Sequence, residues 1–190
     1  MMQLPFVGGR SLPGLIIALV LATGPAALPA TAQAPKPAST AAGLPGGAQS
    51  LSETFEDWQV VCAMPQGVKR CAIGQQQTDP KTRQRVLSVE IQPKGAGAEG
   101  LLVLPFGLAL DKGVTLKVGE ADLTPALRFS TCLPQGCFVP LVLDAKALAS
   151  LRKAAEASVG AVSDSGQAVS FPVSLKGLPA AFDRAAALGS

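Results

Sequence analysis

The 190-residue sequence has no histidine, no tyrosine and one tryptophan, and aromatic residues make up only 4% of it. Without an imidazole base, catalysis by Ser-His-Asp or Cys-His arrangements is excluded. The shortage of aromatic rings, together with a formal net charge of only +3, also argues against a nucleic-acid-binding protein. Such proteins show a dense basic face and rings on which bases stack.

Long apolar runs are scarce as well, and the clearest one lies near the N-terminus. Residues 12–21 are apolar apart from Pro13 and Gly14, and Arg10 precedes them. This run is about half of the ~20 residues that a membrane-spanning helix needs. The pattern predicts a signal peptide at residues 1–34, with an uncleaved anchor as the alternative. Either way the remainder is expected outside the cytoplasm, with no later transmembrane segment.

The next segment, residues 35–52, contains mostly alanine, proline, glycine, serine and threonine, with Lys36 as its one charge. Such a composition buries too little apolar surface to offset the entropy lost on ordering. We therefore expect a disordered linker at residues 35–52. Residues 53–190 are long enough for one domain with one core.

All four cysteines lie in this predicted domain: Cys62, Cys71, Cys132 and Cys137. An even number in an exported protein predicts disulfides. The short loops favour Cys62 with Cys71 and Cys132 with Cys137, and crossed pairing remains an alternative. Their spacing and the lack of histidine argue against zinc, and no CxxC redox motif is present. We expect no metal, no cofactor and no catalytic residue.

Alternation of apolar and polar residues predicts a mainly β domain. In the first predicted strand, residues 55–62, the side chains of Trp58, Val60 and Cys62 should face the core. An apolar segment at 101–110 is interrupted by Pro105 and is expected to form a hairpin with residues 114–118. Further strands are predicted at 69–77, 85–92, 127–131, 138–143, 158–163 and 167–175.

Helical spacing appears only near the C-terminus. It predicts one helix at residues 145–155, capped by Asp144, and a second at 179–187. The predicted fold is an immunoglobulin-like β-sandwich with one or two short helices, stapled by disulfides.

Charged residues offer two candidate sites. Glu56 with Asp57 and Glu120 with Asp122 are neighbouring acids, which we interpret as solvated surface. The alternative is a carboxylate site in an enzyme or accessory factor that acts on envelope polymers. Neighbours in sequence do not establish the convergence in a cleft that such a site requires.

The second candidate is basic. Lys81, Arg83 and Arg85 alternate, as if along one strand face, with Lys69 and Arg70 predicted nearby. They could hold an anionic surface such as lipid head groups or polysaccharide, or protect a strand edge from pairing. Likewise, residues 101–110 could form a partner-binding strip, although a core strand is the favoured interpretation.

An ordered set of motifs resembles the invasion associated locus B (IalB) family over residues 53–190. The motifs are Asp57-Trp58-x-Val60-x-Cys62, Cys71, Arg85-Val-Leu87, Leu104-Pro-Phe-Gly-Leu108, Asp111-x-Gly113-Val114, Phe129-x-x-Cys132-x-x-x-Gly136-Cys137, Val169-Ser-Phe171-x-Val173-Ser-Leu175-x-Gly177 and Ala180-Ala181-Phe182. No single element is specific, but their order is.

The resemblance implies an exported protein of alphaproteobacteria, periplasmic or secreted, with peripheral outer-membrane association as an alternative. It also implies an immunoglobulin-like β-sandwich and a role linked to the cell envelope or to host-cell interaction. It supplies no catalytic residue. The expected protein is therefore a non-catalytic binding or structural module, whose partner would be an envelope or host-surface protein.

Overall fold

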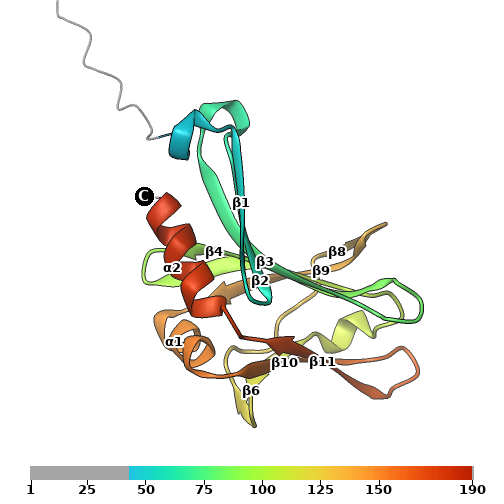
Figure 1. Cartoon of the computed structure of the whole chain (residues 1–190). Coiled ribbons are helices and arrows are strands. Elements are labelled where there is room, and N and C mark those ends of the chain that lie inside the picture. The colour runs from blue at the N-terminus through green and yellow to red at the C-terminus, as the bar shows by residue number, and fades with distance from the viewer. Residues whose placement is uncertain (1–42, 190) are drawn as a thin grey trace, which may run out of the picture. The chain divides into compact units, whose positions relative to one another are not determined.

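Two antiparallel sheets and two helices form the part of the chain that a computed structural model describes, residues 43–189 (Figure 1). The larger sheet contains, in spatial order, β1 (Ser50–Phe55), β2 (Trp58–Ala63), β3 (Arg70–Thr78), β4 (Arg85–Lys94), β5 (Gly97–Leu104), β9 (Gly136–Leu143) and β8 (Thr131–Leu133). The smaller sheet contains β11 (Ala168–Ser174), β10 (Glu156–Val162), β6 (Thr115–Val118) and β7 (Ala121–Asp122). The helices are α1 (Ala145–Lys153) and α2 (Leu178–Gly189), and short 3-10 turns cover Pro45–Gly47, Pro65–Gly67 and Leu110–Lys112.

The mainly β, two-sheet architecture with two short helices and two disulfides confirms the predicted fold class. Its first half is a meander, because β1 to β5 each pair with the next strand along the chain. In an immunoglobulin domain the chain crosses between sheets after the second strand. Here it first crosses after β5.

Regular structure is present before residue 53, where the domain was expected to begin. Strand β1 begins at Ser50, and Leu44 is only 3% exposed, so both fall within the predicted linker. The predicted signal peptide, residues 1–34, and residues 35–42 of the predicted linker lie outside the described residues.

The alternation of apolar and polar residues correctly predicted which side chains of β2 face the core. Trp58, Val60 and Cys62 are each 2% exposed or less, as predicted. The predicted strand at 55–62 is nevertheless two strands, because the chain turns at residues 56–57, where Glu56 has a φ of 52°. This reversal pairs β1 with β2.

The predicted hairpin between residues 101–110 and 114–118 is wrong. Strand β5 has both of its edges occupied, by β4 and by β9, within the larger sheet. Strand β6 instead pairs with β10 and β7 in the smaller sheet. The apolar run is therefore a central strand, and the chain after it passes from one sheet to the other.

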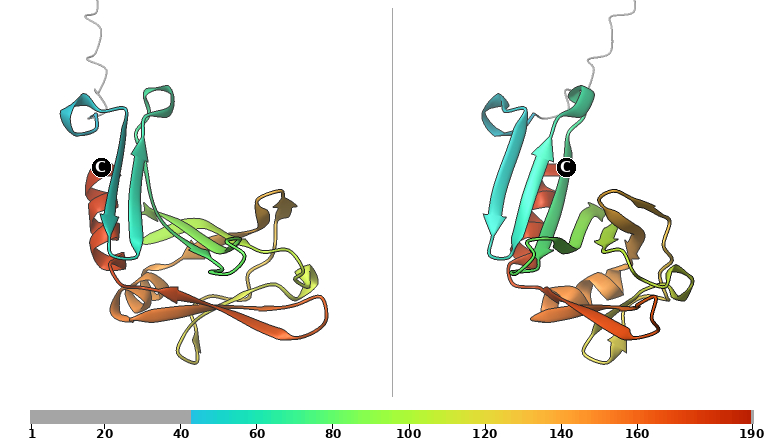
Figure 2. Two further views of the ribbon diagram at one scale, coloured as in Figure 1. Left: turned by 45° about the vertical axis from the view of Figure 1, so that its right-hand side comes forward. Right: turned by 90° about the vertical axis from the view of Figure 1, so that its right-hand side faces the viewer.

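Both helices were predicted, and both cover the core. The Asp144 carboxylate accepts a hydrogen bond of 2.7 Å from the Ala147 backbone N–H, which caps α1 as expected. Helix α2 packs against β1 to β4, and α1 packs against β5 and β9. Figure 2 shows α2 running beside β1 and β2, while β10 and β11 lie across the remaining part of the larger sheet.

All of these elements contribute to one hydrophobic core. A small internal void of about 20 Å³ is surrounded by residues from both sheets and both helices. Its lining includes Trp58, Ile91, Leu102, Leu141, Leu151, Val159, Val173 and Leu178.

A polar contact joins the two sheets at the edge of this core. The carbonyl of Ser174, the last residue of β11, accepts hydrogen bonds of 3.0 Å from both the Trp58 indole N–H and the Gln75 side-chain amide. Gln75, which is 9% exposed, also donates to the Asp57 carbonyl at 3.1 Å. Buried polar groups that find partners in this way specify one arrangement of the elements that carry them.

Gly177 lies in the turn that connects this contact to α2. Its φ is 82°, and a Cβ atom added there would collide with the Phe55 carbonyl and approach Glu56 Cβ to 3.0 Å. The turn before α2 and the turn between β1 and β2 therefore touch at the backbone, and only glycine allows this approach.

We expect Gly177→Ala to destabilise the domain much more than Gly166→Ala. Gly166 has a similar φ of 84° but no atom near the added Cβ, so its substitution carries only the left-handed backbone cost of about 1–2 kcal/mol. The collision at position 177 should at least double that loss. Urea unfolding followed by Trp58 fluorescence measures both, and equal losses would contradict the described packing.

Candidate functional site

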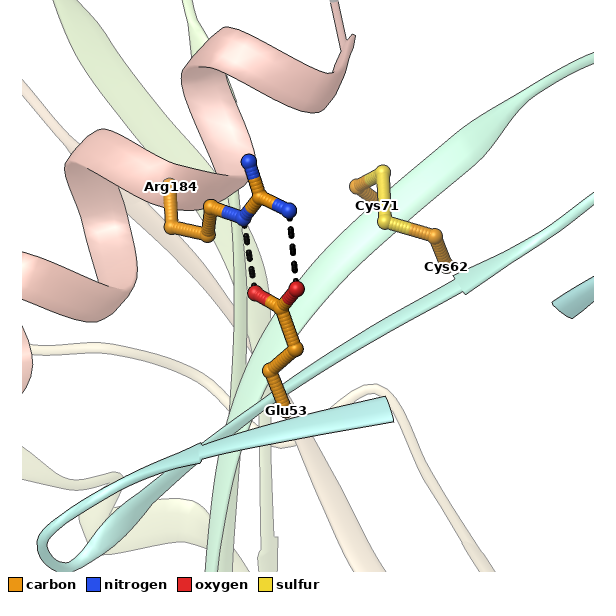
Figure 3. The surroundings of a disulfide bond; sticks show 4 residues. All are labelled: Glu53, Cys62, Cys71 and Arg184. Carbon is orange, nitrogen blue, oxygen red and sulfur yellow. Dashed lines mark hydrogen bonds and ion pairs between the residues drawn. A yellow bond between two sulfur atoms is a disulfide. The ribbon is translucent and has the colours of Figure 1, made fainter. Parts of the chain in front are cut away.

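One disulfide joins Cys62 of β2 to Cys71 of β3, which lie directly opposite each other in the sheet. The Cα atoms are 4.1 Å apart, and the two residues are 0% and 7% exposed. Figure 3 shows the bond next to α2. The bridge fixes the β2–β3 register from the core side and leaves the outer face of both strands free.

The other disulfide joins Cys132 of β8 to Cys137 of β9, again across directly paired positions, with Cα atoms 4.0 Å apart. It closes the short hairpin at the far edge of the larger sheet. Both bridges have the pairing that the short loops favoured, and no cysteine of the chain remains as a thiol. The cysteines therefore offer neither a nucleophile nor a metal ligand.

An ion pair fastens α2 to the edge strand β1 close to the first disulfide (Figure 3). Arg184 Nε and Nη2 donate to the two carboxylate oxygens of Glu53 at 2.7 and 2.8 Å. The hydrogen bond from Arg184 lowers the pKa of the Glu53 carboxyl, and the same bond raises the pKa of the guanidinium. The sequence pattern did not predict this pair, because 131 residues separate its members.

A groove of about 600 Å³ lies over the outer face of β1 to β4. We call it the outer groove. Because strand side chains alternate, it is lined by the residues that do not face the core. The lining comprises Thr54, Glu56, Asp57, Gln59, Val61, Ala63, Arg70, Ala72, Gly74, Gln76, Ser88, Glu90 and Gln92, together with parts of buried Trp58, Cys71, Ile73, Gln75 and Val89.

The chemistry of the outer groove is that of a hydrogen-bonding surface with a flat floor. Small residues on adjacent strands, Ala72, Gly74 and Ser88, leave the centre open, and amide side chains surround them. A second hollow of about 320 Å³ over β4, β5 and β9 shares Glu90 and Gln92 with the groove. The two hollows form one shallow, elongated surface, which suits an extended chain better than a compact small molecule.

The candidate acids are divided between two places. Glu56 and Asp57 line one end of the outer groove, where the Asp57 carboxylate accepts a 2.6 Å hydrogen bond from the Ser174 hydroxyl. Glu120 and Asp122 lie at the β6–β7 turn in the smaller sheet, and Asp122 pairs with Lys117 at 3.6 Å. The structure therefore does not bring the two predicted acid pairs together.

The candidate basic residues are also divided, and the prediction that they follow one strand face is wrong. Strand β3 ends at Thr78 and β4 begins at Arg85, so Lys81 and Arg83 belong to the connecting loop. Arg70 lies at the other end of β3, eight residues from Thr78, which corresponds to roughly 26 Å along a strand. Arg70 contributes to the outer groove, whereas Lys81 and Arg83 do not.

Neither a metal site nor a membrane-spanning helix is found in residues 43–189. Within that range no cluster of three or more metal-ligating side chains occurs. None of the helices described there is long and apolar enough to cross a membrane. The outer groove thus stands as the candidate site, and sequence reasoning missed it, because nothing in the alternation distinguishes a binding face from a solvated one.

Comparison with known proteins connects this structure to a named family. The family described as invasion associated locus B (IalB) protein matches residues 58–186. The invasion protein B homolog of Brucella abortus strain 2308 is 45% identical over 150 residues, which cover 78% of this chain and 86% of the relative. Invasion protein B of Bartonella bacilliformis is 38% identical over 127 residues, covering 65% of this chain and 68% of the relative.

A solved structure agrees with this similarity. The crystal structure of invasion associated protein b from Bartonella henselae superposes with a TM-score of 0.69 at 28% sequence identity. The match covers 73% of this chain and 97% of that chain. These matches confirm the resemblance that the motifs indicated.

Removing the Cys62–Cys71 bridge by alanine substitution should cost more stability than removing Cys132–Cys137. Closure of such short loops is worth about 2–3 kcal/mol for each bridge in the chain-entropy model. The first pair also leaves space in the core, because it is almost fully buried, whereas Cys132 is partly exposed. Urea titration of the two double variants makes the comparison, and a larger loss for the second pair would refute it.

Acid should weaken the attachment of α2. The folded-state pKa of Glu53 is lowered, so its pairing with Arg184 stabilises the fold above the unfolded pKa of about 4.3 and is lost as the pH falls through the folded value. We expect Glu53→Gln to lower Tm at pH 7, with a difference from the parent that shrinks toward pH 3. Thermal unfolding at several pH values measures this. Glu120→Gln, in the exposed β6–β7 turn, is the control with the same charge change, and an equal effect there would contradict the assignment.

Proposed function

This chain belongs to the invasion associated locus B family, and we propose that it acts as a non-catalytic binding module of the bacterial cell envelope. In this proposal the chain is exported by its N-terminal signal peptide and works in the periplasm or as a secreted protein. Its partner is an envelope or host-surface protein. The names of its relatives refer to invasion, and a link to host-cell interaction is proposed here on that basis.

The observation that carries the proposal is the separation of the two faces of the larger sheet. The inner face holds the core, the buried disulfide and the contacts to α2. Within residues 43–189 no helix or strand packs on the outer face of β1 to β4, and this face forms the outer groove. A sheet that is rigidly supported from one side presents its other side in a fixed shape, which lowers the conformational cost of binding.

The lining of the outer groove favours an extended polypeptide as the bound segment. Amide groups of Gln59, Gln76 and Gln92 can each donate and accept, as a peptide backbone requires. Val61, which is 45% exposed, offers an apolar contact within the same surface. An aromatic stacking platform of the kind that many sugar sites use is not among the exposed lining residues, because Trp58 is only 2% exposed.

Site-specific photocrosslinking in living cells tests the outer groove. A photoreactive side chain at Gln59 or Gln76, both exposed on the outer face, should trap a defined envelope or host protein. The same probe at Lys146, exposed on α1, should not. Ala72→Arg, which fills the floor of the groove, should reduce the crosslink by about tenfold if the interface centre is there.

The control for this experiment is the stability of the Ala72→Arg variant. Ala72 lies on the outer face, so its substitution should leave the unfolding midpoint of the domain nearly unchanged. Crosslinks that form equally from Lys146, or that persist in a folded Ala72→Arg variant, would refute the proposed site. Turnover of an envelope polymer that is lost in Glu90→Gln would favour the enzymatic alternative instead.

A further inference from the structure

Exposed apolar side chains gather in the loops at one end of the sandwich. Phe106 is 61% exposed, Leu110 47% and Leu133 48%. All three belong to loops or to the short β8 edge, and none lines the outer groove. Single exposed apolar residues are normal on protein surfaces, whereas several at one end call for an explanation.

Backbone contacts bring these loops together. The Ala109 N–H donates to the Val162 carbonyl at 2.8 Å, and the Asp164 N–H donates to the Gly107 carbonyl at 2.9 Å. These bonds fix the loop that carries Phe106 against the β10–β11 turn. Leu110 follows four residues after Phe106, in the 3-10 turn of the same connection.

The β8–β9 turn joins this end from the other side. A Cβ atom on Gly136 would approach the Leu104 carbonyl to 2.5 Å, so the turn touches the end of β5 just before Phe106. The Arg85 guanidinium also donates to the Gln135 carbonyl. Leu133 is therefore carried by a hairpin whose turn contacts the end of β5 and the first residue of β4. Figure 1 shows this hairpin of β8 and β9 on the right-hand side of the picture.

Cations accompany the apolar side chains. Lys81 and Arg83 are exposed on the β3–β4 loop, which leads directly into Arg85. The Asp79 carboxylate shapes this loop by accepting bonds from the backbone N–H groups of Lys81 and Thr82, at 2.9 and 2.7 Å. The one acid of the loop is thus engaged within it, and the two cations project from a defined turn.

The other loops at this end carry charges of both signs. Lys112 pairs with Asp111 at 3.3 Å, and Asp164 is exposed on the β10–β11 turn. This end of the domain therefore carries four basic residues and three acidic ones. The basic residues are Lys81, Arg83, Arg85 and Lys112, and the acidic ones are Asp79, Asp111 and Asp164. The excess of positive charge is small, so apolar contact has to supply much of any affinity.

We propose that this loop end, carrying Phe106, Leu110, Leu133, Lys81 and Arg83, binds the surface of an anionic lipid bilayer. Apolar side chains at loop tips can enter the boundary between head groups and acyl chains, while neighbouring lysine and arginine contact the anionic head groups. A bilayer accepts separate, protruding side chains. A protein partner would instead require a complementary surface of about 800 Å². The proposal does not depend on the outer groove.

Flotation with lipid vesicles tests the proposal on the exported protein purified from the periplasm. The parent protein should float with vesicles of phosphatidylethanolamine and phosphatidylglycerol, and much less with vesicles of phosphatidylcholine. Phe106→Ser should reduce the bound fraction at least about threefold. Lys81→Glu combined with Arg83→Glu should reduce it similarly and weaken its dependence on salt.

Val142→Ser is the matched control, because Val142 is 70% exposed but lies on the outer face of β9. It should leave vesicle binding unchanged. As a second readout, the fluorescence of Phe106→Trp should move to shorter wavelength when anionic vesicles are added. Failure of the parent to float, or equal binding by Phe106→Ser and Val142→Ser, would overturn the proposal. A photoreactive side chain at Leu110 that traps an envelope protein, in a parent that binds no vesicles, would assign this end to a protein partner instead. In neither case would the outer groove be affected, since Ala72→Arg tests it separately.

Discussion

The carbonyl of Ser174 is the point on which the arrangement of the two sheets depends. It ends β11 of the smaller sheet and accepts one hydrogen bond from β2 and one from β3 of the larger sheet. Three residues later, Gly177 touches the backbone of Phe55, and α2 begins directly afterwards. Since the donors are nearly buried, leaving either without this acceptor would carry the full cost of an unsatisfied polar group. The contact therefore determines where α2 starts and which part of the sheet it covers.

With α2 in this position, the inner face of the larger sheet is covered and its outer face at β1 to β4 is left open. The helix and the smaller sheet together cover the inner face, and the Glu53–Arg184 pair fastens the helix to the edge strand. The Cys62–Cys71 bridge also lies on that side, so the covalent link between β2 and β3 leaves their outer face clear. The strands can therefore carry small or polar residues outward without loss of stability, and this freedom is what opens the outer groove.

The sequence predicted features that depend on local pattern, and it failed where distant residues decide. Alternation identified Trp58 and Val60 as core residues, because one face of the strand is wholly apolar. Strand β1 escaped notice, since its inward residue Glu53 looks unsuitable until Arg184 pairs with it from α2. The loop at Lys81 resembled a strand because its basic residues alternate, although Asp79 folds it into a turn.

Prediction of the sites failed for a related reason. The outer groove combines ordinary polar residues from four strands, so only the pairing register reveals that they share one face. The exposed Phe106 lies within the motif that helped to identify the family, in an apolar run that indicated a core strand. Phe106 is exposed because β5 ends at Leu104, so the residues that follow leave the sheet.

The outer groove and the loop end have no lining residue in common, which bears on how the domain could work. A domain attached to a lipid surface by loops at one end loses part of its translational and rotational freedom. A second partner that meets the groove then encounters a surface with a preferred orientation, at a raised local concentration. Neither step requires a conformational change, and a disulfide-stapled domain with a single core is suited to such passive presentation. Simultaneous occupation of both surfaces would follow from their separation alone.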